Sequence, residues 1–133
     1  MSELRRVLVC GGRNYDDRKF MYDKLDAILA MGGIDVLIQG GTSGADEMAA
    51  DWALLKSVPL LTYFPHWKLH GNAAGPIRNA KMIAHGKPTH VMAFEGGRGT
   101  ADMVKKSKAA NVHVFEYLAG ETRHTRPNPQ GAE

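Results

Sequence analysis

The sequence predicts an α/β fold, a three-layer sandwich in which helices cover both faces of a mostly parallel five-stranded sheet. Two observations lead to this prediction. Short apolar segments alternate with segments of helical period along nearly the whole chain. Glycine-rich turns follow three of the apolar segments, where each strand would give way to a helix. Short apolar strands that are separated by helices indicate a parallel sheet with right-handed crossovers.

The five expected strands are short and rich in β-branched and aromatic residues, as strands buried on both faces are. They cover residues 5–10, 35–39, 59–64, 90–94 and 112–117. Helices are expected between them, over residues 18–31, 44–56, 76–85 and 100–110. Proline suits a first helical position, which puts the start of the third helix at Pro76. The segment before it, 66–75, is expected to be the longest irregular loop in the domain.

Length and composition indicate one ordinary globular domain. The chain has 133 residues, of which 44% are hydrophobic and 23% are charged, and such a chain buries a core without disulfides or metals. We expect the domain to span residues 1–118. Residues 119–133 are rich in Gly, Thr, Arg, Pro and Asn and have no apolar period, so a flexible C-terminal tail is expected there.

Charge and cysteine content bear on compartment and partners. No segment approaches the about 20 apolar residues of a membrane span, and residues 1–6 lack a signal-peptide pattern. The single cysteine, Cys10, forms no internal disulfide and suits a reducing, cytoplasmic setting. A formal net charge of +3 is compatible with a phosphorylated ligand but does not indicate nucleic acid. We therefore expect a small-molecule partner, and neither a membrane nor a nucleic acid.

The glycine-rich turns are the main candidates for ligand binding. Turns at the carboxyl ends of parallel strands would line one crevice with backbone N–H groups and helix N-termini, an arrangement that holds phosphate. The candidate phosphate-binding residues are Gly11, Gly12 and Arg13 in the first turn, Gly40, Gly41, Thr42, Ser43 and Gly44 in the second, and Gly96, Gly97, Arg98, Gly99 and Thr100 in the third.

The second and third turns differ in their side chains. Thr42 or Ser43 is expected to cap the helix that follows, with Glu47 completing a capping box. Asp46 has two equally good interpretations, a carboxylate favoured by the helix dipole or a ligand of ribose hydroxyls. The third turn lacks both the Gly-Lys-Ser/Thr ending of a Walker A loop and the dinucleotide-binding glycine spacing.

The segment around the third expected helix supplies further candidates. Arg78 and Asn79 lie in its expected first turn, where a cation opposes the helix dipole; this misfit favours a role for Arg78 as a fork on phosphate, with Asn79 beside it. Trp67 fits stacking on a base and packing over the sheet edge equally well. His66 and His70 have no evident third ligand, so no metal site is expected, and no cofactor is expected either.

Several of these segments, taken together and in order, resemble the SLOG superfamily. Residues 38–53 are similar to its glycine-rich second-strand segment. Residues 96–100 resemble most of the signature Pro-Gly-Gly-x-Gly-Thr-x-x-Glu of its LOG proteins, and residues 78–82 their Arg-Lys-x-x-Met element. The nearest pattern is that of the small YspA, cpYpsA-related branch. Its motifs are an early Gly-Gly-Arg, a Gly-Ala-Asp, an Ala-Gly-Pro-Ile-Arg-Asn and a Gly-Gly-x-Gly-Thr-Ala-Asp-Met. The resemblance covers residues 5–117.

The resemblance implies a Rossmann-like sheet with a nucleotide-derived ligand at the glycine turns. LOG proteins are phosphoribohydrolases, which cut the bond between a base and ribose 5′-phosphate and pair into dimers, so a homo-oligomer is expected. Arg78 matches their functional arginine. Three positions depart from the pattern, since Met103 stands where the signature has its Glu, Asn79 replaces Lys, and Glu95 replaces Pro.

The departure at Met103 leaves two functions open. In the first, the protein is a sensor or processing protein whose cleft holds a phosphorylated nucleoside, and it does not carry out the LOG reaction. Alternatively, another carboxylate would replace the missing acid in hydrolysis of an N-glycosidic bond, which needs a carboxylate near the sugar. The candidates for that role are Asp46 first, Glu95 second and Asp102 third, and with Arg78 they make up the candidate catalytic set. A nucleic-acid module is disfavoured by the weak charge.

Overall fold

The computed structural model describes residues 4–117. In chain order its elements are β1 (Arg6–Cys10), α1 (Arg18–Gly32), β2 (Val36–Gln39), α2 (Ala45–Leu55), β3 (Leu60–Thr62), α3 (Trp67–His70), the 3₁₀ turn η1 (Gly71–Ala73), α4 (Ala74–Ala84), β4 (His90–Ala93), α5 (Arg98–Ala109) and β5 (His113–Glu116). The expected tail, 119–133, lies outside the described residues. Within the described part, no helix is both long and apolar enough to cross a membrane.

The sheet confirms the predicted fold class, a Rossmann-like α/β sandwich. Its five strands are all parallel and lie in the order β3-β2-β1-β4-β5. The chain first builds outward from β1 to β3 and then crosses to start β4 on the other side of β1. Ligands of open parallel sheets bind beyond the carboxyl ends of the strands at such a reversal of order. The topology therefore places the expected ligand edge between β1 and β4.

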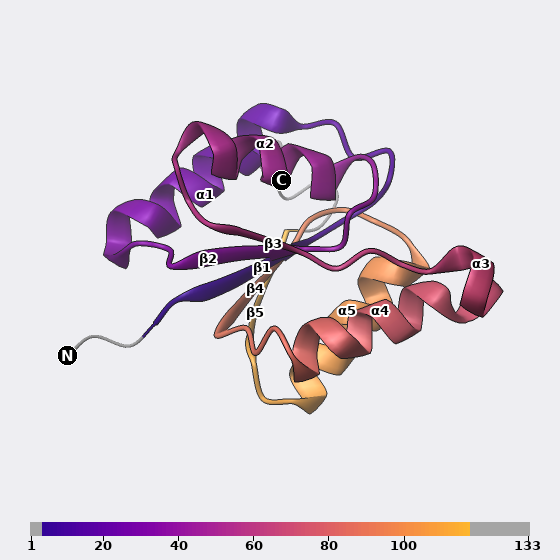
Figure 1. The fold of residues 1–133 in the computed structure, drawn as a ribbon. Helices are drawn as coiled ribbons and strands as arrows, with labels where there is room; N and C mark the ends of the chain where they lie inside the picture. Colours follow the sequence, from indigo (N-terminus) through magenta and orange to yellow (C-terminus); the bar gives the residue numbers. More distant parts are fainter. Residues whose placement is uncertain (1–3, 118–133) are drawn as a thin grey trace, which may run out of the picture.

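Helices cover both faces of the sheet, with α1 and α2 on one side and α4 and α5 on the other (Figure 1). Alternation along β1 matches this arrangement, because successive side chains of a strand point to opposite faces. Val7 and Val9 pack with the core under α1 and α2, whereas Leu8 and Cys10 pack with the core under α4 and α5. The strand is buried on both faces, as its uninterrupted apolar sequence predicts.

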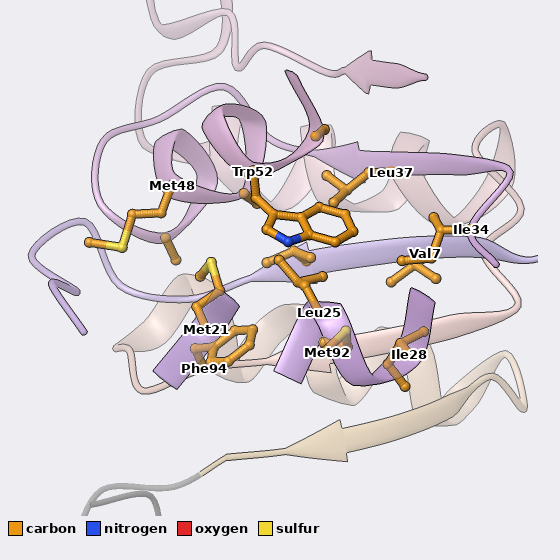
Figure 2. Close-up of a cluster of buried hydrophobic side chains, with 14 of the residues drawn as sticks. Val7, Met21, Leu25, Ile28, Ile34, Leu37, Met48, Trp52, Met92 and Phe94 are labelled. Atoms are coloured by element: carbon orange, nitrogen blue, oxygen red, sulfur yellow. The ribbon is translucent and has the colours of Figure 1, made fainter. Parts of the chain in front are cut away.

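The larger core lies between the sheet and helices α1 and α2 (Figure 2). Trp52 of α2 is fully buried at its centre, close to Leu25 of α1 and Leu37 of β2. Its indole Nε1 donates a hydrogen bond to Asp26 Oδ1 at 2.9 Å, so the one polar atom of the ring is satisfied. This core fixes α1 and α2 against the strands whose ends carry the first two glycine turns.

The smaller core lies under α4 and α5. Met82 of α4 and Met103 of α5 are each 1% exposed and pack with Leu8, Ile38 and Val91 of the sheet. Met103 is thus part of the core. Its position, where the LOG signature has a glutamate, is occupied by a packing residue that has no acid–base chemistry.

The structure corrects the sequence-based expectation for the segment before α4. Residues 66–75 are not an irregular loop, because they form α3 and η1 and then enter α4 at Ala74. Pro76 is therefore the third residue of α4. Proline is tolerated there because the first N–H groups of a helix have no intrahelical acceptor. Arg78 consequently lies in the second turn, and the expected misfit with the helix dipole does not arise.

Candidate functional site

A cleft of about 500 Å³ lies at the carboxyl ends of β1, β2 and β4, which is the expected ligand edge. Loops after these strands, the start of α4 and the first turn of α5 form its walls. Its lining residues are Val9, Cys10, Gly11, Gly12, Arg13, Gly40, Thr42, Asp46, Trp67, Asn72, Gly75, Pro76, Arg78, Asn79, Met82, Gly97, Arg98, Gly99, Thr100, Asp102 and Met103. A volume of this size suits a small organic ligand.

The first turn of α5 forms the wall best suited to an anion. Gly97 is its N-cap, and the first backbone bond of the helix runs from Ala101 N to Gly97 O at 3.0 Å. The N–H groups of Arg98, Gly99 and Thr100 have no backbone acceptor among the described residues. Three such N–H groups at the positive end of a twelve-residue helix are an arrangement that favours negative charge.

Glycines in this turn serve two purposes. A Cβ on Gly96 would overlap Thr100 Oγ1 and lie 2.7 Å from Gly12 N, so glycine is needed there for packing. By contrast, a Cβ on Gly97 or Gly99 would meet no described atom within 4 Å. The space beside Gly97 and Gly99 is open, as expected if a ligand approaches the backbone there.

In the second turn, several backbone N–H groups already have acceptors within the protein. Gly41 N donates to Gln39 Oε1 at 2.6 Å, and Ala45 N donates to Gly12 O at 3.1 Å. Gly41 and Gly44 have φ of +72° and +74°, which explains the glycines by backbone conformation. The expected side-chain cap of α2 was wrong, because Gly44 is the N-cap and no side chain caps the helix. Ser43 Oγ instead donates to Arg13 O at 3.2 Å.

Asp46 lies in the first turn of α2 and is only 6% exposed. Its Oδ2 accepts hydrogen bonds from Thr42 Oγ1 at 2.8 Å and from Thr42 N at 3.2 Å. Burial raises the pKa of Asp46, and the hydrogen bonds from Thr42 and the charge of Arg78 oppose that rise only in part. The cleft therefore contains a carboxyl group that takes up a proton more readily than an exposed aspartate.

Arg78 enters the cleft from α4 and is held on two sides. Its Nη1 donates to Gly40 O, and its Nε donates to Asn79 Oδ1 at 2.9 Å. A Cβ on Gly40 would overlap the guanidinium, so the glycine makes room for the arginine. Burial lowers the pKa of Arg78 while Asp46 raises it, and the guanidinium stays charged at neutral pH. The structure thus holds a fixed cation beside Asp46.

The opposite wall carries a second carboxylate, Asp102 of α5. Asn79, 3% exposed, donates from Nδ2 to Asp102 Oδ2 at 3.0 Å and to Gly99 O at 3.2 Å. Lys106 pairs with Asp102 Oδ1 at 2.6 Å. Burial acts to raise the pKa of Asp102, but the hydrogen bonds from Lys106 and Asn79 outweigh it and lower that pKa. Asp102 is therefore stabilised in its charged form by Lys106 and Asn79, whereas burial disfavours the charged form of Asp46.

Arg13 and Trp67 line the cleft and contact each other. Arg13 lies in the loop after β1, and its guanidinium carbon is 5.0 Å from the centre of the Trp67 ring. Trp67 begins α3 and is 44% exposed. The segment that we expected to be a loop therefore contributes an ordered aromatic ring to the cleft.

The structure brings most of the predicted site residues together. Arg78, Asp46, Asn79 and residues from all three turns line the cleft. Gly41, Ser43, Gly44 and Gly96 are near it but are not among its lining residues. Glu95 lines two neighbouring cavities, one of about 660 Å³ beside α5 and β5, and its backbone oxygen accepts from Gly12 N at 2.9 Å. The structure thus favours Asp46 and Asp102 over Glu95 as carboxylates of this cleft.

Sequence reasoning did not place Cys10, Asn72 or Met82 in the site. Cys10 ends β1 directly before Gly11, and that position alone would have located it at the ligand edge. The pKa of the Cys10 thiol is raised, mainly by burial and to a smaller extent by the negative charge of Asp46. Only the packing of η1 and α4 in the structure shows that Asn72 and Met82 line the cleft. Within residues 4–117, no group of His, Cys, Asp and Glu side chains is arranged to hold a metal ion.

These features define a class of protein, an open parallel α/β domain whose cleft, lined by charged as well as apolar residues, meets a helix N-terminus at the topological switch point. Residues 5–70 match the model of the YspA, cpYpsA-related SLOG family. The Gene 61 protein of Mycobacterium phage D29 is 31% identical over 122 residues, covering 86% of this chain and 97% of the phage protein. The chain belongs to the YspA, cpYpsA-related SLOG family.

Proposed function

We propose that the cleft binds a phosphorylated nucleoside, with its phosphate on the first turn of α5. The observation that carries the proposal is the set of N–H groups of residues 98–100, which have no backbone acceptor among the described residues and border the cleft. Three arginines, Arg13, Arg78 and Arg98, line the same cleft. Helix N-termini and arginine forks both bind phosphate through charge-assisted hydrogen bonds.

The charge balance of the cleft supports a ligand with at least one phosphate. Of its two carboxylates, Asp102 is already paired with Lys106 at 2.6 Å. Asp46 has a raised pKa and faces the charge of Arg78. The three arginines therefore leave an excess of positive charge that a phosphate dianion would neutralise. Membership of the SLOG family suggests the same class of nucleotide-related ligand.

Binding without chemistry, as a sensor or carrier, is the simpler form of the proposal. Met103 occupies the position of the signature glutamate and is buried in the smaller core. A thioether neither moves a proton nor stabilises a developing positive charge on a sugar. With that acid absent, the remaining groups still bind phosphate.

Hydrolysis of an N-glycosidic bond is the second candidate, and Asp46 is the observation that favours it. A buried carboxyl group with a raised pKa is suited to acid–base work near neutral pH, and Arg78 lies beside it. In this version Asp46 takes over the role of the missing glutamate near the sugar. We expect Asp46→Asn to lose turnover and keep binding; full turnover in that variant would remove Asp46 from the mechanism.

The proposal is tested with nucleoside mono-, di- and triphosphates, ADP-ribose and NAD, each incubated with the pure protein. Calorimetry measures binding, and chromatography detects free base and ribose phosphate. Binding of intact nucleotide supports a sensor or carrier, whereas release of free base supports the hydrolase. Arg98→Ala should weaken binding, and Lys105→Ala, on the same helix but outside the cleft lining, is the matched control. If no phosphorylated compound binds, the proposal is wrong.

A further inference from the structure

We infer that Trp67 forms the nucleobase subsite of the cleft and that the base is recognised through its face rather than its edge. The inference rests on the proposed function and makes it more specific. It assigns a ligand class to one wall of the cleft, an aromatic heterocycle attached to the phosphorylated sugar.

The burial of the two tryptophans separates their roles. Trp52 is fully buried in the larger core and its Nε1 is bonded to Asp26. Trp67 is 44% exposed and lines the cleft. A large apolar ring that stays exposed in a concave site gains stability when a flat ligand covers it. Packing over the sheet edge, the other interpretation from the sequence, does not account for that exposure.

The ring of Trp67 is held from two sides of the fold. Trp67 itself starts α3, in the connection between β3 and α4. Arg13, from the loop after β1, places its guanidinium carbon 5.0 Å from the ring centre. A cation over an aromatic face restrains the ring. Because the ring of Trp67 is then already oriented, less side-chain entropy is lost when a ligand binds to it.

Apart from Arg13, which lies over the ring of Trp67, the lining residues of the α3–α4 segment closest to it in the chain suit an uncharged ligand group. Asn72, Gly75 and Pro76 line the cleft on the same α3–α4 segment, and none of them is ionisable. A Cβ on Gly75 would have Trp67 Cη2, at 4.0 Å, as its nearest described atom, so the space beside the ring is open. The ligand would therefore have an anionic part, bound at the first turn of α5, and a flat, neutral part, bound at this wall.

Stacking favours large bases and tolerates changes at the base edge. We therefore expect AMP and GMP to bind with similar affinity, and UMP more weakly. Ribose 5-phosphate, which has no base, should bind more weakly than AMP. Asn72 is an exposed amide on this wall, and it would contact a base edge without requiring a particular pattern of donors and acceptors.

The test combines calorimetry with tryptophan fluorescence, with AMP and ribose 5-phosphate as probes. Trp67→Ala should weaken AMP binding about ten-fold, within a range of about 5- to 150-fold for a lost base–aromatic stack, and leave ribose 5-phosphate unchanged. Trp67→Phe should retain most of the AMP affinity. AMP should quench the fluorescence of the wild type but not that of Trp67→Phe, in which Trp52 remains as the reference. Leu69→Ala is the matched control, because Leu69 is a 75% exposed residue of α3 outside the cleft lining.

Two results would overturn the inference and leave the proposed function in place. Equal affinities of the wild type for AMP and ribose 5-phosphate would leave the phosphate site in place and remove the base subsite. Equal weakening of both probes in Trp67→Ala, with an unchanged melting temperature, would show that the ring acts on the cleft as a whole. If neither probe binds the wild type, the proposed function and the inference both fail.

Discussion

Asn79 of α4 donates a hydrogen bond from Nδ2 to Oδ2 of Asp102 on α5 at 3.0 Å, and so joins the two helices that flank the cleft. Oδ1 of the same amide accepts from Arg78 Nε at 2.9 Å. One buried asparagine thus orients an arginine on one side and a carboxylate on the other. The network continues to Lys106, which pairs with Asp102 at 2.6 Å.

Replacing Asn79 by alanine should reduce both stability and binding. The variant leaves the Nε of Arg78 and one oxygen of Asp102 without their present partner, and unsatisfied buried polar groups cost about 1–3 kcal/mol. Urea denaturation should show a loss of unfolding free energy of this size. Asn14→Ala, at an exposed position outside the cleft lining, should change stability by less than about 0.5 kcal/mol. Equal losses in the two variants would contradict the role of the network.

Replacing Arg78 by alanine should weaken nucleotide binding. A charge-assisted hydrogen bond contributes about 1.5–3 kcal/mol, which corresponds to a loss of affinity of about 10- to 150-fold. Arg78→Lys keeps the charge but not the fork, so we expect an intermediate loss. Calorimetry with AMP measures all three proteins, and Lys81→Ala on the same helix is the control. Unchanged affinity in Arg78→Ala would discard Arg78 as a ligand.

Asp46 should make stability depend on pH in a direction that its burial determines. Its pKa is raised in the folded state, so the favourable contribution of protonated Asp46 is complete below the unfolded-state pKa of about 3.9 and is lost as pH rises through the folded-state pKa. Asp46→Asn is neutral at every pH. The unfolding free energy of the variant relative to wild type should therefore rise as the pH increases from about 4.

Denaturation of both proteins across this pH range measures the effect of Asp46. Asp23→Asn, at a 61% exposed carboxylate that pairs with Lys19, is the control for general effects of charge removal. A relative stability of Asp46→Asn that falls with pH would show that the carboxylate is stabilised in the fold, contrary to the effect of its burial.

Alanine at two glycines of the third turn should have opposite effects. Gly99→Ala meets no described atom within 4 Å and lies in a helix, so stability should be unchanged or rise by up to about 1 kcal/mol. Its methyl group occupies the open space at the phosphate subsite, so AMP affinity should fall. Gly96→Ala should destabilise the protein, because its Cβ would overlap Thr100 Oγ1. Thermal melts and calorimetry separate the two cases, and full AMP affinity in Gly99→Ala would move the phosphate away from this turn.

Local sequence patterns predicted the elements and the ligand edge because both depend on short-range properties. Alternation of apolar strands and helices predicts a parallel sheet, in which the glycines that follow the strands share one edge. The order that puts β2, β1 and β4 side by side came from the structure. Caps and short helices were predicted less well. Gly44, rather than Thr42 or Ser43, is the N-cap of α2, and α3 formed in a segment where a loop was expected.

The sequence by itself determined the fold class, the strand ends at which a ligand would bind, and the family of the protein. Only the tertiary structure decided which candidate residues contact one another and which are buried or exposed at the cleft. Arg78 contacts Gly40, 38 positions away, and Asn79 contacts Asp102, 23 positions away. Such contacts depend on how α4 and α5 pack on the sheet, and neighbouring residues in the sequence carry no record of that packing. The same packing buries Asp46 and Met103 and leaves Trp67 exposed at the cleft.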